Sequence, residues 1–503
     1  MTGKVYLVGA GPGDPGLITV RGKQLIESAD AIVYDALVNP ALIPGSARES
    51  GTPELYSTGR RKGSKKSPAQ DVINALLVKL AREGKRVVRL AGGDPMVFGR
   101  GGEEAEACND AQVDFEIVPG VTAGIAAPAY AGIPITQRGL SRAVTFVSGS
   151  ASRSKIGSQT NWTALAQSGA TLILYNALDT FPAISEALTK GGMPGEIPAA
   201  AIRWATRSKQ KTVIATLASL AEKLKEQEIT APAVIVIGWT VVIKDEIAWF
   251  ERRSLFGKRI VVTRAAQQAQ VLSEKLRDLG ADVIEMPATR VVRLDSSQLR
   301  KVLPDLASYQ WLIFTSQNGV GIFWENLLAS GLDARALAPL RIAAVGPATA
   351  AALLERGIAV DVIPERFVAE ALLEKLRGRQ DVRGTRVLYV TAESAREALP
   401  EGLNEMGAEV TVMPLYRSTT DGAGAGRLAK RVGADEVDVV TFTSGSAVRA
   451  YVEAIGAELA RKAPAASIGP QTSEALRSAG IEVRFEAKDS TIDGLVSAIV
   501  DGF

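Results

Sequence analysis

Short apolar runs that end in glycine turns recur along the first part of the chain. Lys4–Val8 is an apolar run that leads into the turn G-A-G-P-G-D at Gly9–Asp14. Arg86–Leu90 leads in the same way into a second glycine turn at Ala91–Glu104. An apolar run before such a turn predicts a strand that ends in a tight loop. Because glycine has no Cβ, two such loops predict a ligand crevice at the carboxyl edge of a sheet.

Strand-like and helix-like segments alternate on both sides of a polar bend near residue 250. A new strand signal, Arg259–Thr263, follows this bend. The alternation predicts an α/β fold with largely parallel sheets. We expect one domain at residues 1–250 and a second at residues 257–503.

The second domain contains an internal repeat. Three matches occur in the same order in both copies: Arg259–Pro287 with Arg386–Pro414, Ile313–Ser316 with Thr441–Ser444, and Val345–Leu353 with Ile468–Leu476. A period this long predicts two domain-sized lobes, because solenoid repeats are only about 20–50 residues long. We expect one lobe at about residues 257–289 and 420–503, and the other at about residues 293–416.

Each copy of the repeat ends a strand on Thr-Ser and starts a helix after Gly-Pro-x-Thr. Hydroxyl groups and backbone N–H groups at helix starts serve as caps, and they also bind anions. For any one of these residues a cap is the simpler interpretation. Four such edges around one cleft would form a carboxylate-binding surface, and two linked lobes suit hinge closure on a ligand.

Composition is typical of a globular protein and excludes several classes of function. The 503 residues are 46% hydrophobic and 22% charged, which suits large buried cores. A net charge of +3 does not indicate nucleic acid as a partner. The apolar runs are too short to span a membrane, and the chain does not start with a signal-peptide pattern. Cys108 is the only cysteine, which excludes an intramolecular disulfide. We expect a cytoplasmic protein.

Histidine is absent from the chain. This excludes Ser-His-Asp and Cys-His catalysis and the usual imidazole zinc sites, so we expect no metal. Acid–base chemistry must then use carboxylates, Lys, Arg, Tyr or water. The composition favours reactions that depend on positioning and electrostatics.

A dinucleotide site is the competing interpretation of the first glycine turn. Asp35 ends the run Ala31–Asp35, about where an acidic residue would meet a ribose hydroxyl. However, Pro12 and Pro15 stand where the first turn of a dinucleotide-binding helix should begin. The pattern therefore does not favour NAD.

The motifs of the two halves resemble two known families. Residues 1 to about 250 resemble the uroporphyrinogen-III C-methyltransferases of the tetrapyrrole methylase superfamily. The motifs are G-A-G-P-G-D-P-G-L-I-T (9–19), I-V-Y-D-A-L-V (32–38), G-G-D-P-M-V-F-G-R-G-G-E-E (92–104), V-P-G-V-T-A (118–123), A-Y-A-G-I-P-I-T (129–136) and A-P-A-V-I-V-I-G (231–238). Residues from about 257 to 503 resemble uroporphyrinogen-III synthase through the T-S and V-G-P-x-T repeats and Pro414–Arg417. The resemblance implies a two-lobed methylase fold, followed by a synthase of two similar lobes joined by a two-strand linker.

The methylase resemblance implies that S-adenosylmethionine binds between two α/β lobes. It implies a proton acceptor at Asp35, for which a strand-end aspartate is the alternative, and it places Arg60 where the family has a lysine proton donor. The positions implied to contact the cofactor are Pro12, Gly92, Gly93, Asp94, Val97, Thr122, Ala123, Asn176 and Ala205.

The implied substrate carries eight carboxylates, which favours cationic side chains. Five cations occur in seven residues at Arg60–Lys66. Such a run is usually a solvated loop, but beside a polyanion it is better interpreted as a clamp. The candidate substrate-binding cations are Arg61, Lys62, Arg21 and Arg100.

The chain departs from the methylase pattern at several positions. Arg60 replaces a lysine and is a poor proton donor, because arginine stays charged. Ala91 also replaces a lysine, and Asn176 replaces the usual methionine. Gln137 and Ser150 stand where the family has histidines. These changes suggest a weakened methylase half.

The synthase resemblance implies closure of linear hydroxymethylbilane with one pyrrole ring inverted. Tyr416 matches the tyrosine implied to assist the loss of water, and a half-buried strand aromatic is the alternative interpretation. The positions implied to line the cleft are Thr315, Ser316, Thr349, Thr443, Ser444 and Thr472.

Three hypotheses follow for the whole chain. The first is a bifunctional enzyme that makes uroporphyrinogen III and methylates it at C2 and C7 to precorrin-2. The second is a synthase fused to an inactive methylase-like binding module. The third is a methylase of the same superfamily that acts on a later corrinoid, which the adjacent synthase argues against. The family also implies a homodimer through the methylase half.

Overall fold

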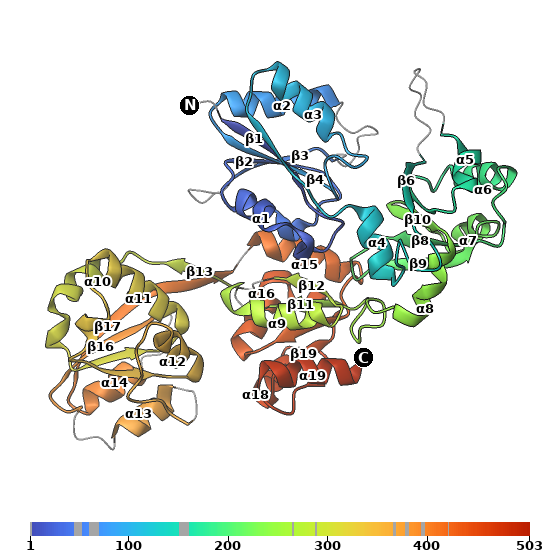
Figure 1. Cartoon of the computed structure of the whole chain (residues 1–503). Helices are drawn as coiled ribbons and strands as arrows, with labels where there is room; N and C mark the ends of the chain where they lie inside the picture. The colour runs from blue at the N-terminus through green and yellow to red at the C-terminus, as the bar shows by residue number, and fades with distance from the viewer. Residues whose placement is uncertain are drawn as a thin grey trace. The chain divides into compact units, whose positions relative to one another are not determined.

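The computed structural model describes residues 3–44, 53–59, 70–149, 160–263, 266–286, 289–365, 369–377, 382–393, 398–420 and 422–503. It divides into two compact units: Met1–Lys258 with Leu276–Asp282 and Phe503, and Arg259–Lys275 with Val283–Gly502. The described residues form four five-stranded sheets, each with its own helices (Figure 1). We call the four layered structures lobes A to D in the order in which their first strands occur. The predicted α/β fold class is confirmed.

Lobe A is a parallel sheet in the order β3-β2-β4-β1-β5. Helices lie on both faces, so the central strands are almost entirely apolar, as expected for a buried parallel sheet. The strands are β1 (Lys4–Gly9), β2 (Ala31–Tyr34), β3 (Glu54–Ser57), β4 (Arg86–Ala91) and β5 (Phe115–Val118). The helices are α1 (Val20–Glu27), α2 (Gln70–Arg82) and α3 (Gly101–Asp110), with 3₁₀ turns at Pro15–Leu17 and Pro40–Leu42.

Lobe B follows through α4 (Ala123–Ala131), and its sheet has the order β6-β7-β10-β8-β9. Only β6 and β7 are parallel, whereas the pairs β7–β10, β10–β8 and β8–β9 are antiparallel. The prediction of largely parallel sheets is therefore wrong for lobe B. The short connection from Arg203 to Lys211 permits only an antiparallel pair, because a parallel crossover needs a dozen or more residues.

The strands of lobe B are β6 (Val144–Ser148), β7 (Thr171–Tyr175), β8 (Pro198–Arg203), β9 (Lys211–Thr216) and β10 (Ala233–Ile237). Its helices are α5 (Trp162–Gln167), α6 (Phe181–Lys190), α7 (Leu220–Glu226), the 3₁₀ helix Trp239–Ile243 and α8 (Lys244–Ile247). No helix among the described residues is both long and apolar enough to cross a membrane.

Lobe C has the strand order β12-β11-β18-β19-β20. Its strands are β11 (Arg259–Val262), β12 (Asp282–Glu285), β18 (Val439–Phe442), β19 (Ala465–Ser467) and β20 (Val483–Glu486). Its helices are α9 (Ala266–Asp278), α15 (Gly422–Gly433), α16 (Gly445–Ile455), α17 (Ala457–Ala460), α18 (Pro470–Ser478) and α19 (Ile492–Gly502). The strands β11, β18, β19 and β20 pair in parallel.

Lobe D lies within the chain of lobe C and has the order β13-β17-β16-β14-β15. Its strands are β13 (Thr289–Arg293), β14 (Trp311–Phe314), β15 (Arg341–Ala344), β16 (Arg386–Ala392) and β17 (Glu409–Thr420). Its helices are α10 (Ser297–Val302), α11 (Gln317–Ala329), α12 (Pro347–Leu354), α13 (Ala369–Arg377) and α14 (Ala398–Glu405), with 3₁₀ turns at Leu303–Ser308 and Ala334–Leu337. The strand β13 pairs with the end of β17 in antiparallel orientation, which forms the two-strand linker expected from the sequence.

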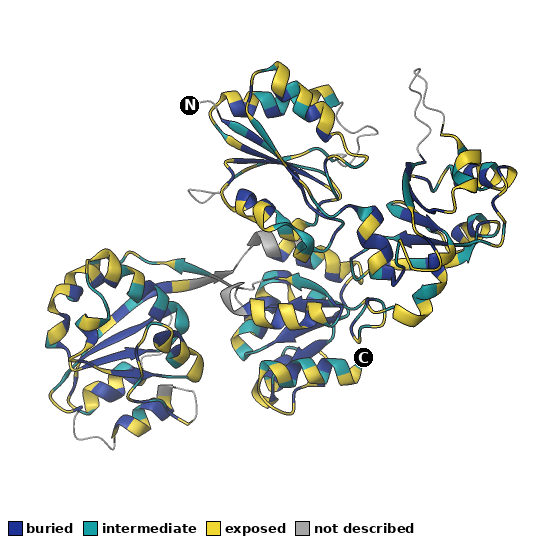
Figure 2. Ribbon diagram, in the orientation of Figure 1, coloured by how far each residue is buried: buried dark blue, intermediate teal, exposed yellow. Residues whose placement is uncertain are grey.

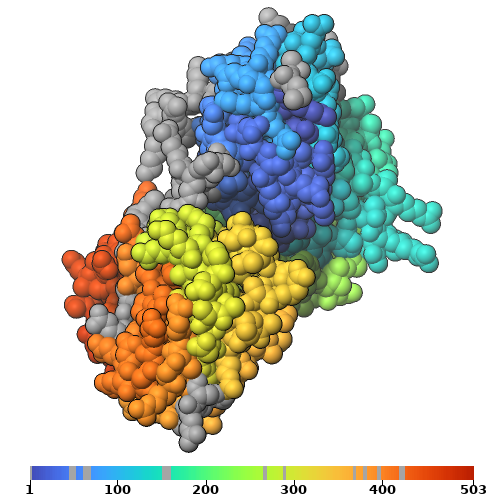
Figure 3. All heavy atoms as spheres, turned by 90° about the vertical axis from the view of Figure 1, so that its left-hand side faces the viewer, coloured from blue at the N-terminus to red at the C-terminus, as the bar shows by residue number. Residues whose placement is uncertain are grey.

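The buried residues follow the sheets and the inner helix faces, while the outer helix faces are exposed (Figure 2). In lobe D, two clusters of buried side chains lie on the two faces of the sheet. In the space-filling view, residues of about 290–420 form the yellow-green to orange surface that faces the viewer (Figure 3).

Candidate functional sites

The two predicted glycine turns meet at the carboxyl edge of the lobe A sheet. Gly11 N donates to Gly93 O at 3.1 Å, and Gly93 N donates to Gly11 O at 2.8 Å. A Cβ on Gly9 would lie 2.5 Å from the Cα of Gly120, and a Cβ on Gly120 would lie 2.3 Å from Gly93 O. Only glycines allow this approach, so the ends of β1, β4 and β5 are packed backbone against backbone.

Gly93 faces the start of α4. Its φ is +71°, and a Cβ built on it would point to the backbone nitrogen of Ala123 at 3.7 Å. The glycine therefore leaves open the space in front of the first turn of this helix. Thr122 provides no side-chain cap to α4, and Gly124 N already donates to the Tyr175 hydroxyl, so the amide of Ala123 is the one in the first turn that faces this space and could meet an anionic group such as a carboxylate.

Asp94 and Thr122, both predicted to contact a cofactor, use their side chains within the protein. Asp94 accepts from Met96 N at 2.7 Å and from Gly120 N at 3.0 Å, which holds the second glycine turn in place. The Thr122 hydroxyl lies 2.6 Å from the Tyr175 hydroxyl, which also accepts from Gly124 N at 2.6 Å. Both side chains thus help to fix the protein around the second glycine turn and the start of α4.

Tyr175 was not identified from the sequence, where it appears as an ordinary strand residue. Its ring centroid lies 4.8 Å from that of Phe98. Burial raises the pKa of Tyr175, although the hydrogen bonds with Thr122 and Gly124 act in the opposite direction. A Cβ on Gly124 would lie 2.3 Å from the tyrosine hydroxyl, so this contact explains a glycine in the first turn of α4.

Four residues other than glycine have left-handed backbone conformations near these strand ends. They are Phe98 (φ 51°), Asn176 (φ 49°), Trp204 (φ 49°) and Thr206 (φ 64°). Such strain is uncommon and clusters at functional sites. Asn176 follows β7 and is exposed, and the predicted contact Ala205 lies between two of these residues. Asparagine tolerates this conformation better than most side chains.

Asp14 joins the first glycine turn to lobe B. Its backbone N–H donates to the Thr206 hydroxyl at 2.9 Å, and its carboxylate accepts from the Tyr130 hydroxyl at 2.8 Å. Burial and this contact with Asp14 raise the pKa of Tyr130 above its ordinary value. The turn that contains Pro12 is thus fixed from both lobes.

Asp35 lies beside the second glycine turn. Its Oδ1 is 2.8 Å from Arg89 Nη2 and accepts from the Thr58 hydroxyl at 3.0 Å. Its Oδ2 accepts from Gly92 N at 3.3 Å. With 35% of its side chain exposed, the carboxylate is fixed by three donors and still accessible.

Arg89 is buried behind Asp35 and was not identified from the sequence. It is 5% exposed, and its Nε lies 2.8 Å from Oε1 of Glu104, which is 1% exposed. Burial by itself would lower the pKa of Arg89, but the charges of Asp35 and Glu104 outweigh it and the pKa is raised. The structure thus contains a buried cation between two carboxylates, one of them at the candidate site.

Of the other predicted cations, Arg21 and Arg100 are described, and both pair with carboxylates other than Asp35. Arg60, Arg61 and Lys62 lie outside the described residues. Arg21 lies over β5 and pairs with Glu116 through bonds of 2.9 and 3.0 Å. Arg100 precedes α3 and lies 3.6 Å from Glu103. Among the described residues, Arg89 is therefore the cation that contacts Asp35.

Tyr416 of β17 is the candidate residue of lobe D. It is 6% exposed, and its hydroxyl lies 2.7 Å from the Ser316 hydroxyl. Ser316 caps α11 and accepts from Gly319 N at 3.1 Å. Burial raises the pKa of Tyr416, while the bond with Ser316 acts in the opposite direction.

Tyr416 also marks the point where β17 changes partners. It lies opposite Ala392, the last residue of β16, at a shift in register. On its other side it is paired with Arg293, the last residue of β13. The phenol therefore lies where the sheet of lobe D gives way to the two-strand linker.

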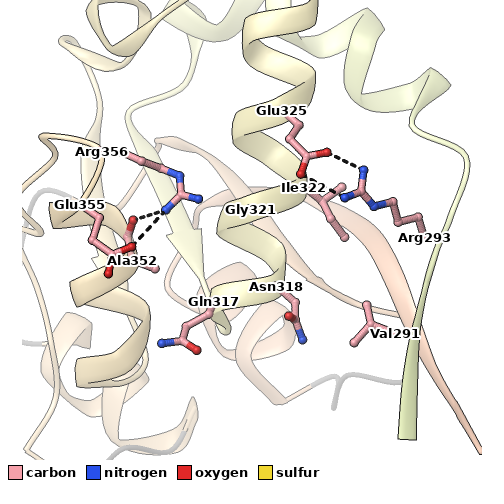
Figure 4. A pocket seen from close by; sticks show the side chains of 10 residues that line it. All are labelled: Val291, Arg293, Gln317, Asn318, Gly321, Ile322, Glu325, Ala352, Glu355 and Arg356. Carbon is pink, nitrogen blue, oxygen red and sulfur yellow. Dashed lines mark hydrogen bonds and ion pairs between the residues drawn. The ribbon is translucent and has the colours of Figure 1, made fainter. Parts of the chain in front are cut away.

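A pocket of about 370 Å³ lies close to this point (Figure 4). Arg293 contacts Glu325 across it at 3.0 Å, and Arg356 lies 4.0 Å from Glu355. The amides of Gln317 and Asn318, the first residues of α11, lie at its other end. The pocket is thus polar, with two cations already paired to carboxylates.

The remaining hydroxyl residues differ in how accessible they are. Ser444 caps α16, as Ser316 caps α11, and accepts from Ala447 N at 3.2 Å. Thr315 and Thr443 are half-buried. Thr349 and Thr472 are buried in the first turns of α12 and α18. For the two serines, the cap interpretation offered by the sequence describes the observed bonds.

Two family models match different parts of the chain. A family model described as Tetrapyrrole (Corrin/Porphyrin) Methylases matches residues 4–221. A second, described as Uroporphyrinogen-III synthase HemD, matches residues 270–497.

Individual relatives agree with these matches. The porphyrin biosynthesis protein HemD of Ruminiclostridium josui is 35% identical over 99% of this chain and 98% of its own length. A uroporphyrinogen-III C-methyltransferase of Bacillus subtilis is 37% identical over 72% of this chain and 73% of its own. Among solved structures, uroporphyrin-III C-methyl transferase from Thermus thermophilus, complexed with S-adenyl homocysteine, is 34% identical. It covers 48% of this chain and 100% of its own, with a TM-score of 0.40.

Proposed function

The chain belongs to the tetrapyrrole methylases in its first part and to the uroporphyrinogen-III synthases in its last part, and we propose which reactions it catalyses. It is a bifunctional enzyme of tetrapyrrole biosynthesis. In our proposal, lobes C and D close hydroxymethylbilane to uroporphyrinogen III. Lobes A and B then methylate this product at C2 and C7 with S-adenosylmethionine, which gives precorrin-2.

The observation that carries the methylase proposal is the fixed Asp35 carboxylate beside the open turn at Gly92 and Gly93. The turn and the Ala123 amide fit a cofactor with a carboxylate of its own, since a Cβ built on Gly93 would meet only the backbone of Thr122 and Ala123 within 4 Å. When bound, S-adenosylmethionine supplies an electrophilic methyl group. Gly92, Gly93 and the backbone of Ala123 are the residues that would hold it.

Methyl transfer requires little acid–base catalysis by the protein. A ring carbon of the substrate is the nucleophile, so the protein has to align it and exclude other orientations. The ring must afterwards lose a proton, and Asp35 Oδ2 is the candidate acceptor. This division of work suits a chain without histidine.

In the synthase part, Tyr416 is the candidate donor of the proton that departs with the hydroxyl group as water. A phenol is protonated at neutral pH, and burial raises the pKa of Tyr416 further, so its hydroxyl carries the proton that the leaving group would take up. Its place at the start of the linker puts it where two lobes could close on a folded tetrapyrrole.

A synthase fused to a weakened methylase is the second candidate. The departures at Arg60, Ala91 and Asn176 favour it, because the family has a lysine, a lysine and a methionine there. The contact between Asp35 and Arg89 favours an active methylase, since the acceptor has a cationic partner that does not depend on those three positions.

One incubation separates the two candidates. The full chain is supplied with hydroxymethylbilane and S-adenosylmethionine, and the products are separated by chromatography. A dimethylated product supports both activities, whereas uroporphyrin III alone after oxidation supports the weakened methylase. Calorimetry with S-adenosylhomocysteine and with NAD tests the cofactor, and tight binding of NAD alone would contradict the proposal.

The association state and cellular placement stay predictions. A homodimer through the methylase half can be checked by light scattering of the full chain at several concentrations. Lack of affinity for nucleic acid can be checked in the same buffer by a gel-shift titration.

A further inference from the structure

We propose that Arg89 is a positioning residue for methyl transfer, held by Glu104 so that it fixes the Asp35 carboxylate toward the turn at Gly92. The inference rests on the proposed function, because it concerns the same acceptor. Arg89 lies behind the carboxylate and contributes no atom to the reacting groups.

Arg89 contacts buried groups of lobe A with part of its guanidinium and the candidate acceptor Asp35 with the rest. Its Nε meets the almost inaccessible Glu104 at 2.8 Å, and its Nη1 donates to Leu90 O at 3.1 Å. Its Nη2 meets Asp35 Oδ1 at 2.8 Å. The planar guanidinium therefore transfers the fixed position of Glu104 to Asp35, which a lysine ammonium cannot do with the same geometry.

Glu104 is itself restrained from a second direction. The side-chain amide of Gln70 donates to its Oε1 at 3.1 Å. Because a buried carboxylate needs both charge and hydrogen-bond partners, these bonds leave Glu104 little freedom to move. Glu104 belongs to α3, which begins at Gly101 near the end of the second glycine turn.

The binding of Asp35 is asymmetric in a way that serves a proton acceptor. Arg89 and Thr58 both bind Oδ1, while Oδ2 has the longer bond of 3.3 Å to Gly92 N. Two donors on one oxygen fix the rotation of the carboxylate. The other oxygen then faces the turn, where it accepts from the Gly92 amide.

The test uses the full chain and four variants of the cluster. Arg89→Lys keeps the charge, and Arg89→Met with Glu104→Met removes both buried charges without leaving one unpaired. Asp35→Asn is made alone and in the background of the double substitution. Arg86→Met, at the opposite end of the same strand, is the matched control and should keep the wild-type rate.

If the inference is right, the double substitution lowers kcat for methylation by at least about tenfold, while the Kd for S-adenosylhomocysteine changes by less than about twofold. Arg89→Lys should restore part of kcat. In the Asp35→Asn background the double substitution should lower kcat by no more than about twofold, because residues that act through one another are not additive.

Additive losses in that cycle would overturn the inference, as would a loss of S-adenosylhomocysteine binding equal to the loss of kcat. If the double variant does not fold, kcat and the Kd for S-adenosylhomocysteine are compared in the same way for Arg89→Lys. Crystal structures give a readout without activity: Asp35 keeping its bond to Gly92 N in the variants would also overturn the inference. A wild-type chain that makes no methylated product, or an Asp35→Asn variant at full rate, would instead contradict the proposed function.

Discussion

Asp35 and Tyr416 are the two candidate proton-transfer groups, and they are held in different ways. Asp35 is fixed by a buried cation, a hydroxyl and a backbone amide, and it remains partly exposed. Tyr416 is buried and its hydroxyl contacts one neutral hydroxyl, that of Ser316. A charge-assisted bond is about twice as strong as a neutral one, so the first site depends much more on its polar partners.

The difference matches the chemistry proposed for each half. A proton acceptor in a methyl transfer must be a charged group in one place, and the structure provides charges to hold it. The ring closure proposed for the synthase part depends mainly on the shape in which the substrate is folded. The neutral phenol of Tyr416 would only protonate the departing hydroxyl group. We therefore expect substitutions around Asp35 to lower the methylation rate strongly, and substitutions around Tyr416 to lower the synthase rate only slightly.

The largest effect is expected for Asp35→Asn. The amide has almost the same shape but cannot accept the ring proton, so methylation should fall by about 10²–10⁴-fold. Synthase activity of the same preparation should be unchanged, which controls for folding. The measurement is product formation from uroporphyrinogen III with saturating S-adenosylmethionine, and a rate within a few-fold of wild type would break the comparison.

A smaller effect is expected for Tyr416→Phe. Deleting one neutral hydrogen bond costs about 0.5–1.5 kcal/mol, so the synthase rate should fall by up to about tenfold. The rate is measured as uroporphyrinogen III formed from hydroxymethylbilane, above the spontaneous formation of the uninverted isomer. A folded variant with no activity above this background would show that Tyr416 is an essential proton donor.

The two capping serines allow a matched test of the Tyr416 contact. Ser316→Ala and Ser444→Ala each remove one helix cap, which costs about 1 kcal/mol of stability. Only Ser316 contacts Tyr416, so only its loss should also lower the synthase rate by a few-fold. Thermal unfolding and synthase rate are measured for both. Equal synthase rates in the two variants would show that Ser316 has no role in the reaction beyond capping its helix.

The smallest effect concerns Cys108, which packs in lobe A near Glu104. Burial, and then the charge of Glu104, raise the pKa of its thiol to about 11, against about 8.5 for a free thiol. The folded chain should therefore react very slowly with a thiol reagent at pH 8. The rate should rise as pH approaches 11 or when the chain unfolds. Fast reaction at pH 8 would show that lobe A opens around the Arg89 cluster.

Much of the fold was predictable, because the relevant signals are local. Apolar runs before glycine turns predicted the strands β1 and β4, and the internal repeat predicted the two similar lobes C and D. The three antiparallel pairs in the mixed sheet of lobe B were missed. Strand direction depends on which strands become neighbours, and β10 enters between β7 and β8 from far along the chain.

The candidate site was predictable only in part. Asp35 and the turn at Gly92 were identified by motif, and the structure brings them together. Arg89 was missed because it looks like one polar residue inside an apolar strand. Its role depends on the pairing with Glu104, which only the packing of α3 against the sheet creates. Arg21 pairs with Glu116 of β5, and its expected contact with substrate stays a prediction.

The placement of lobe D inside the chain of lobe C has a consequence for synthesis on the ribosome. The strands β11 and β12 emerge early, but their sheet is completed only by β18 and the strands after it. Residues 289–420, by contrast, contain every strand of the lobe D sheet without interruption. Lobe D can therefore fold before β18, the strand that pairs with β11 in lobe C, has been synthesised. During that interval the unpaired edges of β11 and β12 are the part of the nascent chain most exposed to aggregation.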